Sequence, residues 1–213
     1  MTPARRLAAL ALFSGSVSAT GDAIAQGLDA WARDGAAQRG DYDRTRTLRY
    51  FVYGAAFAPI SVRWHAFLNA RFPLQAPATA ARPLRSTAAA VLKRIVADQA
   101  AFAPFACGAF VVGMGALEGL GLGELLERMR ERYPRILLAG YCVWPAAQLV
   151  NFSVVPLAYR VPFGSTVGLF WNTYLSWTSA RLERARRPAP QTQAHAPAQA
   201  ARVDTPVNGG PAA

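Results

Sequence analysis

The polar side chains that interrupt the long apolar runs of this chain are the ones that could do chemistry. Asp22 and Gln26 lie four residues apart, so they share one face of a helix. Gln148 and Asn151 lie three apart and share a face in the same way. Such groups are costly in lipid, so they should face neighbouring helices, ions or water. The candidates for a pore lining or a helix interface are Asp22, Gln26, Asp98, Gln99, Trp144, Gln148, Asn151 and Asn172.

These candidates have two interpretations. The amides suit hydrogen bonds between helices, at roughly 0.6 to 2 kcal/mol each, somewhat better than they suit a pore or ligand role. For Asp22 and Asp98, pairing with a nearby arginine competes evenly with a place beside a path. Trp144 adds to the face that carries Gln148, and Pro145 loosens the helix there because it cannot donate a backbone hydrogen bond.

The sequence contains no recognisable enzyme active site. Its two histidines, His65 and His195, lie far apart, and there is no P-loop, no H-E-x-x-H motif and no C-x-x-C pair. The two cysteines, Cys107 and Cys142, sit singly inside apolar runs and are expected to be small buried side chains rather than a disulfide framework. We therefore expect a non-enzymatic protein without catalytic residues, cofactor or metal.

Long uncharged runs must position the polar candidates. A membrane-spanning helix needs about 20 largely apolar residues. Three runs have about that length, at 99–117, 136–159 and 161–180. Two shorter runs, at 7–21 and 50–62, need polar flanking residues to cross a bilayer.

The polar segments complete the predicted organisation. Residues 118–135 mix both charge signs and carry leucines at helical spacing, which favours a short helix on the membrane surface or, equally, a solvated helix. Residues 1–6 form a short lead, 7–184 a helical membrane domain, and 185–213 a disordered tail rich in Pro and Ala. The predicted fold is an all-α integral membrane protein, a bundle of four to five hydrophobic helices with a short surface helix.

Composition and charge indicate the partners. Apolar residues make up 53% of the chain and charged residues 16%, with a net charge of +11. The cations lie beside apolar runs, so we expect the lipid bilayer with anionic headgroups as the partner and no nucleic acid. Glycines four apart, at 115, 119 and 123 and at 164 and 168, favour close helix packing within the monomer and leave a homo-oligomer open.

Several segments together resemble one protein family. The stretch WPAAQLVNF from Trp144, followed by Val155-Pro156, Tyr159-Arg160 and WNTYLSW from Trp171, closely resembles the signature of the twenty-two-kilodalton peroxisomal membrane protein family, which includes the Mpv-type proteins of mitochondria. The resemblance covers about residues 7–182. It departs from the family in its short lead, its longer tail, and Ala58-Pro59 and Trp64-His65 in the second helix.

The resemblance implies a four-span protein of an organelle membrane whose relatives are described as pore-forming. Asp98, residues 102–104, residues 115–117 and Tyr133-Pro134 look most like the mitochondrial branch, so the mitochondrial inner membrane is the expected location and the peroxisomal membrane the alternative. The expected function is a small, modestly selective channel for ions or small metabolites, linked to mitochondrial homeostasis and mitochondrial DNA maintenance. The expected path residues are Asp22, Asp98, Gln148 and Asn151. The alternative is a scaffolding protein without transport; a carrier is less supported, because no internal repeat is found.

Overall fold

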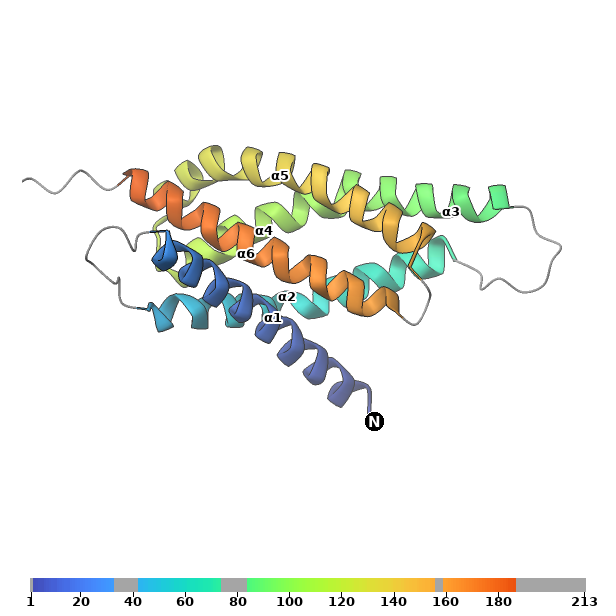
Figure 1. The fold of residues 1–213 in the computed structure, drawn as a ribbon, viewed down its shortest axis with the longest axis horizontal. Helices are drawn as coiled ribbons and strands as arrows, with labels where there is room; N and C mark the ends of the chain where they lie inside the picture. The colour runs from blue at the N-terminus through green and yellow to red at the C-terminus, as the bar shows by residue number, and fades with distance from the viewer. Residues whose placement is uncertain (1, 33–41, 74–83, 156–158, 187–213) are drawn as a thin grey trace, which may run out of the picture.

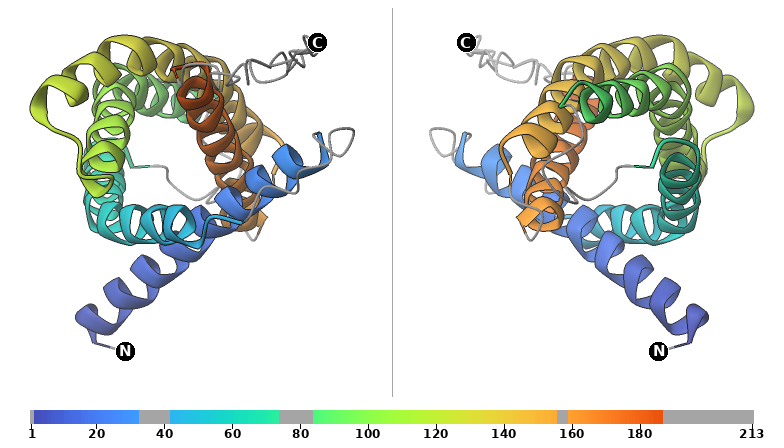
Figure 2. Two further views of the ribbon diagram at one scale, coloured as in Figure 1. Left: turned by 90° about the vertical axis from the view of Figure 1, so that its left-hand side faces the viewer. Right: turned by 90° about the vertical axis from the view of Figure 1, so that its right-hand side faces the viewer.

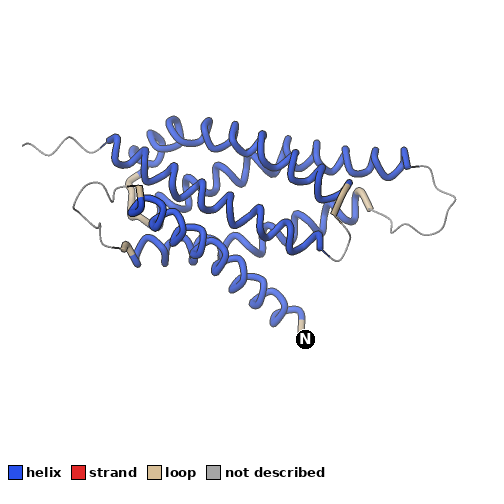
Figure 3. The backbone as a smooth tube through the Cα atoms, in the orientation of Figure 1, coloured by secondary structure: helices blue, strands red, loops and turns tan. Residues whose placement is uncertain are grey.

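The computed structural model describes residues 2–32, 42–73, 84–155 and 159–186 (Figure 1). Regular secondary structure in this part of the chain is helical, as the fold prediction requires (Figure 3). The predicted tail lies outside the described residues from position 187 onward. The helices are α1 (Pro3–Trp31), α2 (Arg44–Arg71), α3 (Leu84–Ala97), the π-helix η1 (Asp98–Phe102), α4 (Ala103–Leu117), α5 (Leu122–Ser153) and α6 (Arg160–Arg186).

The segments α3, η1 and α4 follow one another without a break and form one rod, so the described helices make five rods. The π-helical turn has a local cause. Pro104, in the first turn of α4, has no N–H with which to continue the ordinary helical ladder. The preceding amide, Ala103 N–H, donates instead to the carbonyl of Asp98, five residues back.

Capping residues set several helix ends. The Asp43 carboxylate accepts a hydrogen bond of 2.9 Å from Arg46 N–H and starts α2. Glu124 accepts one of 2.9 Å from Gly121 N–H at the start of α5. Between α4 and α5 the chain turns at Gly119, whose φ of 79° is a left-handed conformation that favours glycine.

The five rods close into a ring. Each one packs against the next in the order α1, α2, α4, α5, α6 and back to α1. Seen end-on, they lie around a common axis, and the N-terminal half of α1 extends away from the others (Figure 2). Side chains of four of the rods fill the inside of the ring with an apolar core: Tyr50, Cys107, Phe110, Val111, Met114, Ile136 and Leu175.

The distribution of side chains is that of an integral membrane protein. Large apolar residues such as Leu12, Phe13 and Leu138 are more than half exposed on the outside of the bundle. Charged residues such as Asp22 and Arg132 are buried within it. A water-soluble protein would show the opposite arrangement.

Two stretches of the described helices have the length and composition to cross a membrane, Ala4–Trp31 and Ala89–Leu117. They contain the predicted spans at 7–21 and 99–117. The predicted spans in α2, α5 and α6 do not meet that measure within the described residues. The number of crossings therefore stays a prediction.

The helix predicted for residues 118–135 exists, but it is not a separate surface helix. From Leu122 onward the segment is the first half of α5, which continues through Pro134 to Ser153, and residues 118–121 connect α4 to it. Leu122 and Leu126 face outward, while Met129 packs against the core. Two charged side chains of the segment, Arg128 and Arg132, are buried, whereas Glu124, Glu127, Arg130, Glu131 and Arg135 are exposed.

The close helix approaches do not occur at most of the glycines predicted for them. A methyl group at Gly164 or Gly168 would meet nothing within 4 Å. At Gly21 on α1 it would lie 2.7 Å from Cβ of Asn172 on α6, and at Gly54 on α2 it would lie 2.8 Å from the Ser14 carbonyl on α1. Glycines 21 and 54 therefore allow α1 to pack closely on both of its neighbours.

Candidate functional site

The carboxylate of Asp22 is fully buried where α1 meets α2 and α6. Its Oδ1 accepts a hydrogen bond of 2.5 Å from Ser176 Oγ and lies 2.8 Å from Nε of Arg46. Its Oδ2 accepts hydrogen bonds of 2.6 Å from Thr47 Oγ1 and 2.8 Å from Gln26 Nε2. These five residues are the Asp22 cluster. Because the charge is paired and both oxygens are satisfied, the cluster ties three helices together.

Two residues of the Asp22 cluster also form hydrogen bonds with backbone groups of neighbouring segments. Gln26 Oε1 accepts a 2.8 Å hydrogen bond from the backbone N–H of Asp43, just before α2 begins. The guanidinium of Arg46 also donates to the backbone carbonyl of Ser176 at 3.0 Å. The predicted shared face of Asp22 and Gln26 is confirmed by the hydrogen bond between them.

Asp98 forms a second cluster, on η1 between α2 and α5. Its Oδ1 accepts a hydrogen bond of 2.8 Å from Trp64 Nε1. Its Oδ2 accepts hydrogen bonds of 2.8 Å from Gln148 Nε2 and 3.3 Å from Gln99 Nε2. These four residues are the Asp98 cluster. Asp98 is only 8% exposed. Unlike Asp22, it accepts these hydrogen bonds from uncharged side chains.

The position of Asp98 in the ring explains which way it faces. Its rod lies between α2 and α5, and the carboxylate bonds to side chains from both. A side chain that reaches both neighbours of its own rod must point toward the ring axis. Arg94, one helical turn earlier, lies near enough for its charge to interact with Asp98. The π-helical turn at this point is of a kind often found at functional sites.

The two clusters lie toward opposite ends of α2. Thr47 belongs to the first and Trp64 to the second, and the 17 residues between these positions correspond to about 26 Å of helix. The hydrocarbon core of a bilayer is about 30 Å thick. The structure therefore places five of the predicted site residues in two clusters that are nearly a membrane's thickness apart: Asp22 and Gln26 in the first, and Asp98, Gln99 and Gln148 in the second.

The remaining candidates join neither cluster. Trp144 packs edge-on against Trp171, with ring centroids 6.0 Å apart. Asn172 lies beside Gly21 at the contact of α6 with α1. Asn151 Oδ1 is buried and has no hydrogen-bond partner among the described residues.

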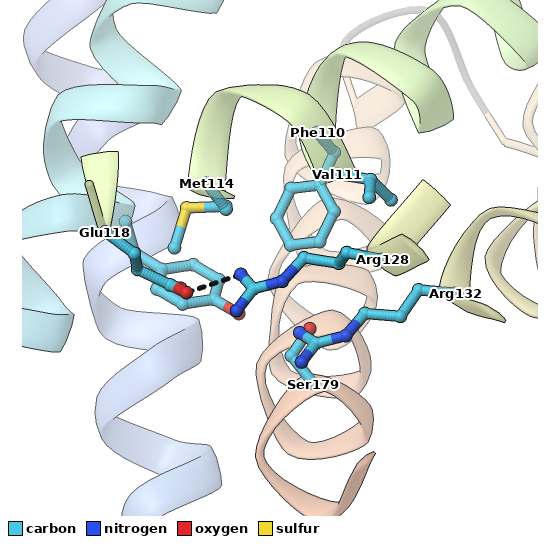
Figure 4. A pocket seen from close by; sticks show the side chains of 8 residues that line it. Phe110, Val111, Met114, Glu118, Arg128, Arg132 and Ser179 are labelled. Atoms are coloured by element: carbon cyan, nitrogen blue, oxygen red, sulfur yellow. Dashed lines mark ion pairs between the residues drawn. The ribbon is translucent and has the colours of Figure 1, made fainter. Parts of the chain in front are cut away.

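A third polar place lies inside the ring and was missed by the sequence interpretation. Arg128 and Arg132 of α5 are 6% and 3% exposed and line a cavity of about 10 Å³, close to the smallest that holds one water molecule (Figure 4). Arg128 forms an ion pair with Glu118. We call this place the arginine cavity; its lining residues are Tyr50, Phe110, Val111, Met114, Glu118, Arg128, Arg132 and Ser179.

The sequence held only weak signals for the residues that complete these sites. Arg46, Thr47 and Ser176 were not among the predicted site residues, because a single arginine or hydroxyl near the end of an apolar run is ordinary. Arg128 and Arg132 lie in the segment predicted to form a surface helix, and charged side chains of mixed sign in such a helix are ordinarily solvated. Their spacing of four residues, which puts both on one helix face, was the available signal.

Comparison with known proteins identifies similar chains. The Mpv17/PMP22 family model matches residues 115–176. Protein sym1 of Schizosaccharomyces pombe is 34% identical over 182 residues, which cover 80% of this chain and 84% of that protein. Protein SYM1 of Gibberella zeae is 36% identical over 182 residues, covering 83% and 94%. The human mitochondrial inner membrane protein Mpv17 is 34% identical over 174 residues, covering 80% and 89%. No solved structure matched the chain.

Proposed function

This chain belongs to the Mpv17/PMP22 family, and we propose that it works as a small channel for ions or small metabolites in the mitochondrial inner membrane. Family membership gives the coarser description, a helical protein of that membrane from a family that is generally non-enzymatic. The channel is our inference from the charged residues of the helix ring. A contribution to mitochondrial homeostasis and mitochondrial DNA maintenance would then be indirect, through the balance of metabolites across the membrane.

The observation that carries the proposal is the state of the Asp98 carboxylate. It is buried, faces the ring axis and accepts hydrogen bonds from Trp64, Gln99 and Gln148, none of which carries a charge. A carboxylate in a low-dielectric interior attracts cations far more strongly than one in water. Rings and clusters of acidic side chains give cation preference to channels in this way. We assign the selective contact to Asp98 and Gln148.

Asp22 has a different role in this proposal. Its charge is already paired with the guanidinium of Arg46, 2.8 Å away, whereas the hydrogen bonds to Asp98 come from uncharged side chains. It has little left to offer a permeating ion. We assign it to the junction that keeps the ring closed, so of the two carboxylates only Asp98 contacts the path.

One observation favours the alternative, a scaffolding protein without transport. The described interior is filled by apolar and hydrogen-bonded side chains, and the arginine cavity has room for about one water molecule. In a scaffold the Asp98 cluster would serve only to join α2, η1 and α5.

Single-channel current from the purified protein in a planar bilayer separates the two. We would compare the wild type with Asp98→Asn and, as a matched removal of a buried carboxylate, Asp22→Asn. A channel should lose part of its cation preference in Asp98→Asn, seen as a shifted reversal potential under a salt gradient. Asp22→Asn should lower thermal stability while the channels that do form keep the wild-type preference.

Folding of each variant is checked beforehand by circular dichroism and thermal unfolding. Silent bilayers with well-folded wild-type protein would support the scaffold. Openings whose selectivity is the same in Asp98→Asn would remove Asp98 from the path.

A further inference from the structure

Exposed cations gather at the end of the ring where α2 ends. Figure 1 shows that α3 begins, α5 ends and α6 begins at this same end. Arg63 and Arg71 of α2 and Lys93 of α3 are exposed here, and we call these three residues the cationic surface. Asp98 is the one acid of the sequence between positions 44 and 117, and it is buried. Residues 132–182 contain no acid, so the second half of α5 and the first half of α6 add none.

Two hydrogen bonds explain why cations from two rods lie together. Trp64 Nε1 donates to the carboxylate of Asp98 at 2.8 Å. Five residues further along α2, Asn69 Oδ1 accepts a hydrogen bond of 2.6 Å from Arg94. The two rods therefore run antiparallel here, and Lys93 lies beside the last turns of α2. The fold thus brings Lys93 to the level of Arg63 and Arg71, although it follows Arg63 by 30 positions in the sequence.

The length of α2 places the cationic surface at the depth of lipid headgroups. The helix has 28 residues, from Arg44 to Arg71, which correspond to about 42 Å. A bilayer measures about 40 to 45 Å when its headgroup layers are included. Each end of α2 therefore reaches one headgroup layer, and Arg71 stands at the last residue of the helix.

The opposite end of the ring has a different charge pattern. There the first half of α5 exposes three acids, Glu124, Glu127 and Glu131, together with the bases Arg130 and Arg135. The attraction of the bases to an anionic headgroup is offset by the repulsion of the acids. The ends of the ring thus differ in the charge that they present to the two leaflets.

Exposed apolar side chains accompany the cations of this surface. Val62 precedes Arg63 and Leu92 precedes Lys93, and all four side chains are exposed. Long basic side chains can lie along apolar surface and still extend their charge to the headgroups. A lipid uses both features, because it offers a phosphate to the cation and acyl chains to the apolar neighbour. A soluble anion would use only the cation.

We propose that the cationic surface binds the headgroups of anionic lipids, and that the opposite end of the ring does not. The ligand class is a phospholipid with a net negative charge. Attraction to an anionic membrane strengthens by a factor of about five for each Lys or Arg near its surface. The surface lies on the exposed side of α2 and α3, so the proposal holds whether or not the ring conducts ions.

Thermal unfolding of the full-length protein in dodecyl maltoside micelles tests the proposal, because this detergent has an uncharged headgroup. A ligand that binds only the folded state raises the unfolding midpoint in a saturable way. One sample receives phosphatidylglycerol, and a second receives phosphatidylcholine, which carries a phosphate but no net charge. A third receives inorganic phosphate, with sodium chloride at equal ionic strength as its reference. The wild type should show a saturable rise with phosphatidylglycerol alone.

Variants at the two ends make the test specific. Arg63→Gln combined with Lys93→Gln should raise the half-saturating concentration of phosphatidylglycerol about 25-fold, a factor of about five for each charge. Arg130→Gln combined with Arg135→Gln removes two exposed cations from the opposite end and should leave that concentration unchanged. Lys93→Arg keeps the charge and should behave as the wild type. All of these positions are exposed, so the midpoint without lipid should hardly change.

Three results would overturn the proposal. One is an equal response of the wild type to phosphatidylglycerol and phosphatidylcholine, including no response to either. Another is an equal loss in the two double variants, which would mean that only the net charge of the protein matters. The third is a saturable rise with inorganic phosphate that the double variant at Arg63 and Lys93 loses, which would make the ligand a soluble anion.

Discussion

Gln148 on α5 donates a hydrogen bond of 2.8 Å to the carboxylate of Asp98, which precedes it in the chain by 50 residues. Trp64 on α2 donates another, also of 2.8 Å, to the other carboxylate oxygen. The position of Asp98 thus depends on two helices from opposite sides of its own rod. Any substitution that moves α2 and α5 apart should therefore break one of these hydrogen bonds and shift the Asp98 carboxylate.

Trp64→Phe should lower the free energy of unfolding by about 1.5 to 3 kcal/mol, the usual worth of a hydrogen bond to a charged group. A phenyl ring can keep the stacking on Phe102, where the centroids are now 5.3 Å apart, but it has no N–H for Asp98. Denaturant unfolding in micelles measures the change. Trp31→Phe, at a side chain that is 78% exposed, is the control and should be nearly neutral. Equal effects at both tryptophans would show that the hydrogen bond contributes nothing.

Asp22→Asn should destabilise the fold by up to about 3 to 5 kcal/mol, because it removes the buried counter-charge of Arg46, whose own side chain is only 21% exposed. Arg46→Gln should have a similar effect for the opposite reason. The double variant should lose clearly less than the two single losses added together, since the residues form one pair. A double-mutant cycle by thermal unfolding measures this coupling. Strictly additive losses would mean that the two side chains act independently.

Gly21→Ala should destabilise the bundle by about 1 to 3 kcal/mol, because the new methyl group would lie 2.7 Å from Cβ of Asn172 and push α1 away from α6. The same substitution at Gly164 meets nothing within 4 Å. There it should be neutral or stabilise the helix by up to about 1 kcal/mol, through the higher helix propensity of alanine. The two unfolding midpoints are compared in the same detergent. A destabilised Gly164→Ala beside an unchanged Gly21→Ala would contradict the packing of α1 on α6.

Ile136→Ala should cost about 2 to 5 kcal/mol, since Ile136 is 1% exposed and belongs to the core inside the ring. Leu138, two residues later on α5, is 65% exposed, so Leu138→Ala should change the stability much less. The two variants remove a similar apolar volume from opposite sides of one helix. Chemical unfolding of the reconstituted protein distinguishes them, and a reversed order would mean that α5 is rotated relative to the ring.

Much of the fold could be predicted because its signals are local. The uncharged runs are read directly from composition, and the pairing of Asp22 with Gln26 follows from a spacing of one helical turn. The boundary of α5 was harder. A proline within a run with mixed charges suggests a break, yet a helix inside a bundle tolerates Pro134.

The site could be predicted only in part. The sequence singled out Asp98 and Gln148 separately, because each is a polar residue in an apolar run, but nothing in their spacing says that they meet. The same holds for Asp22 and Ser176, which are 154 residues apart. Periodicity tells which face of a helix is polar and does not tell which helix lies opposite. Whether these residues line a path stays a prediction.

The sequence by itself determined that this chain is a helical membrane protein of a recognisable family, because hydropathy and helical spacing act within single segments. Only the tertiary structure decided which polar groups become partners, that Asp22 is paired with Arg46 while Asp98 is held by neutral donors, and that Arg128 and Arg132 point inward. The physical reason is that these outcomes depend on how the rods close into a ring. Contacts between helices far apart in the sequence leave no trace in the local pattern of either one.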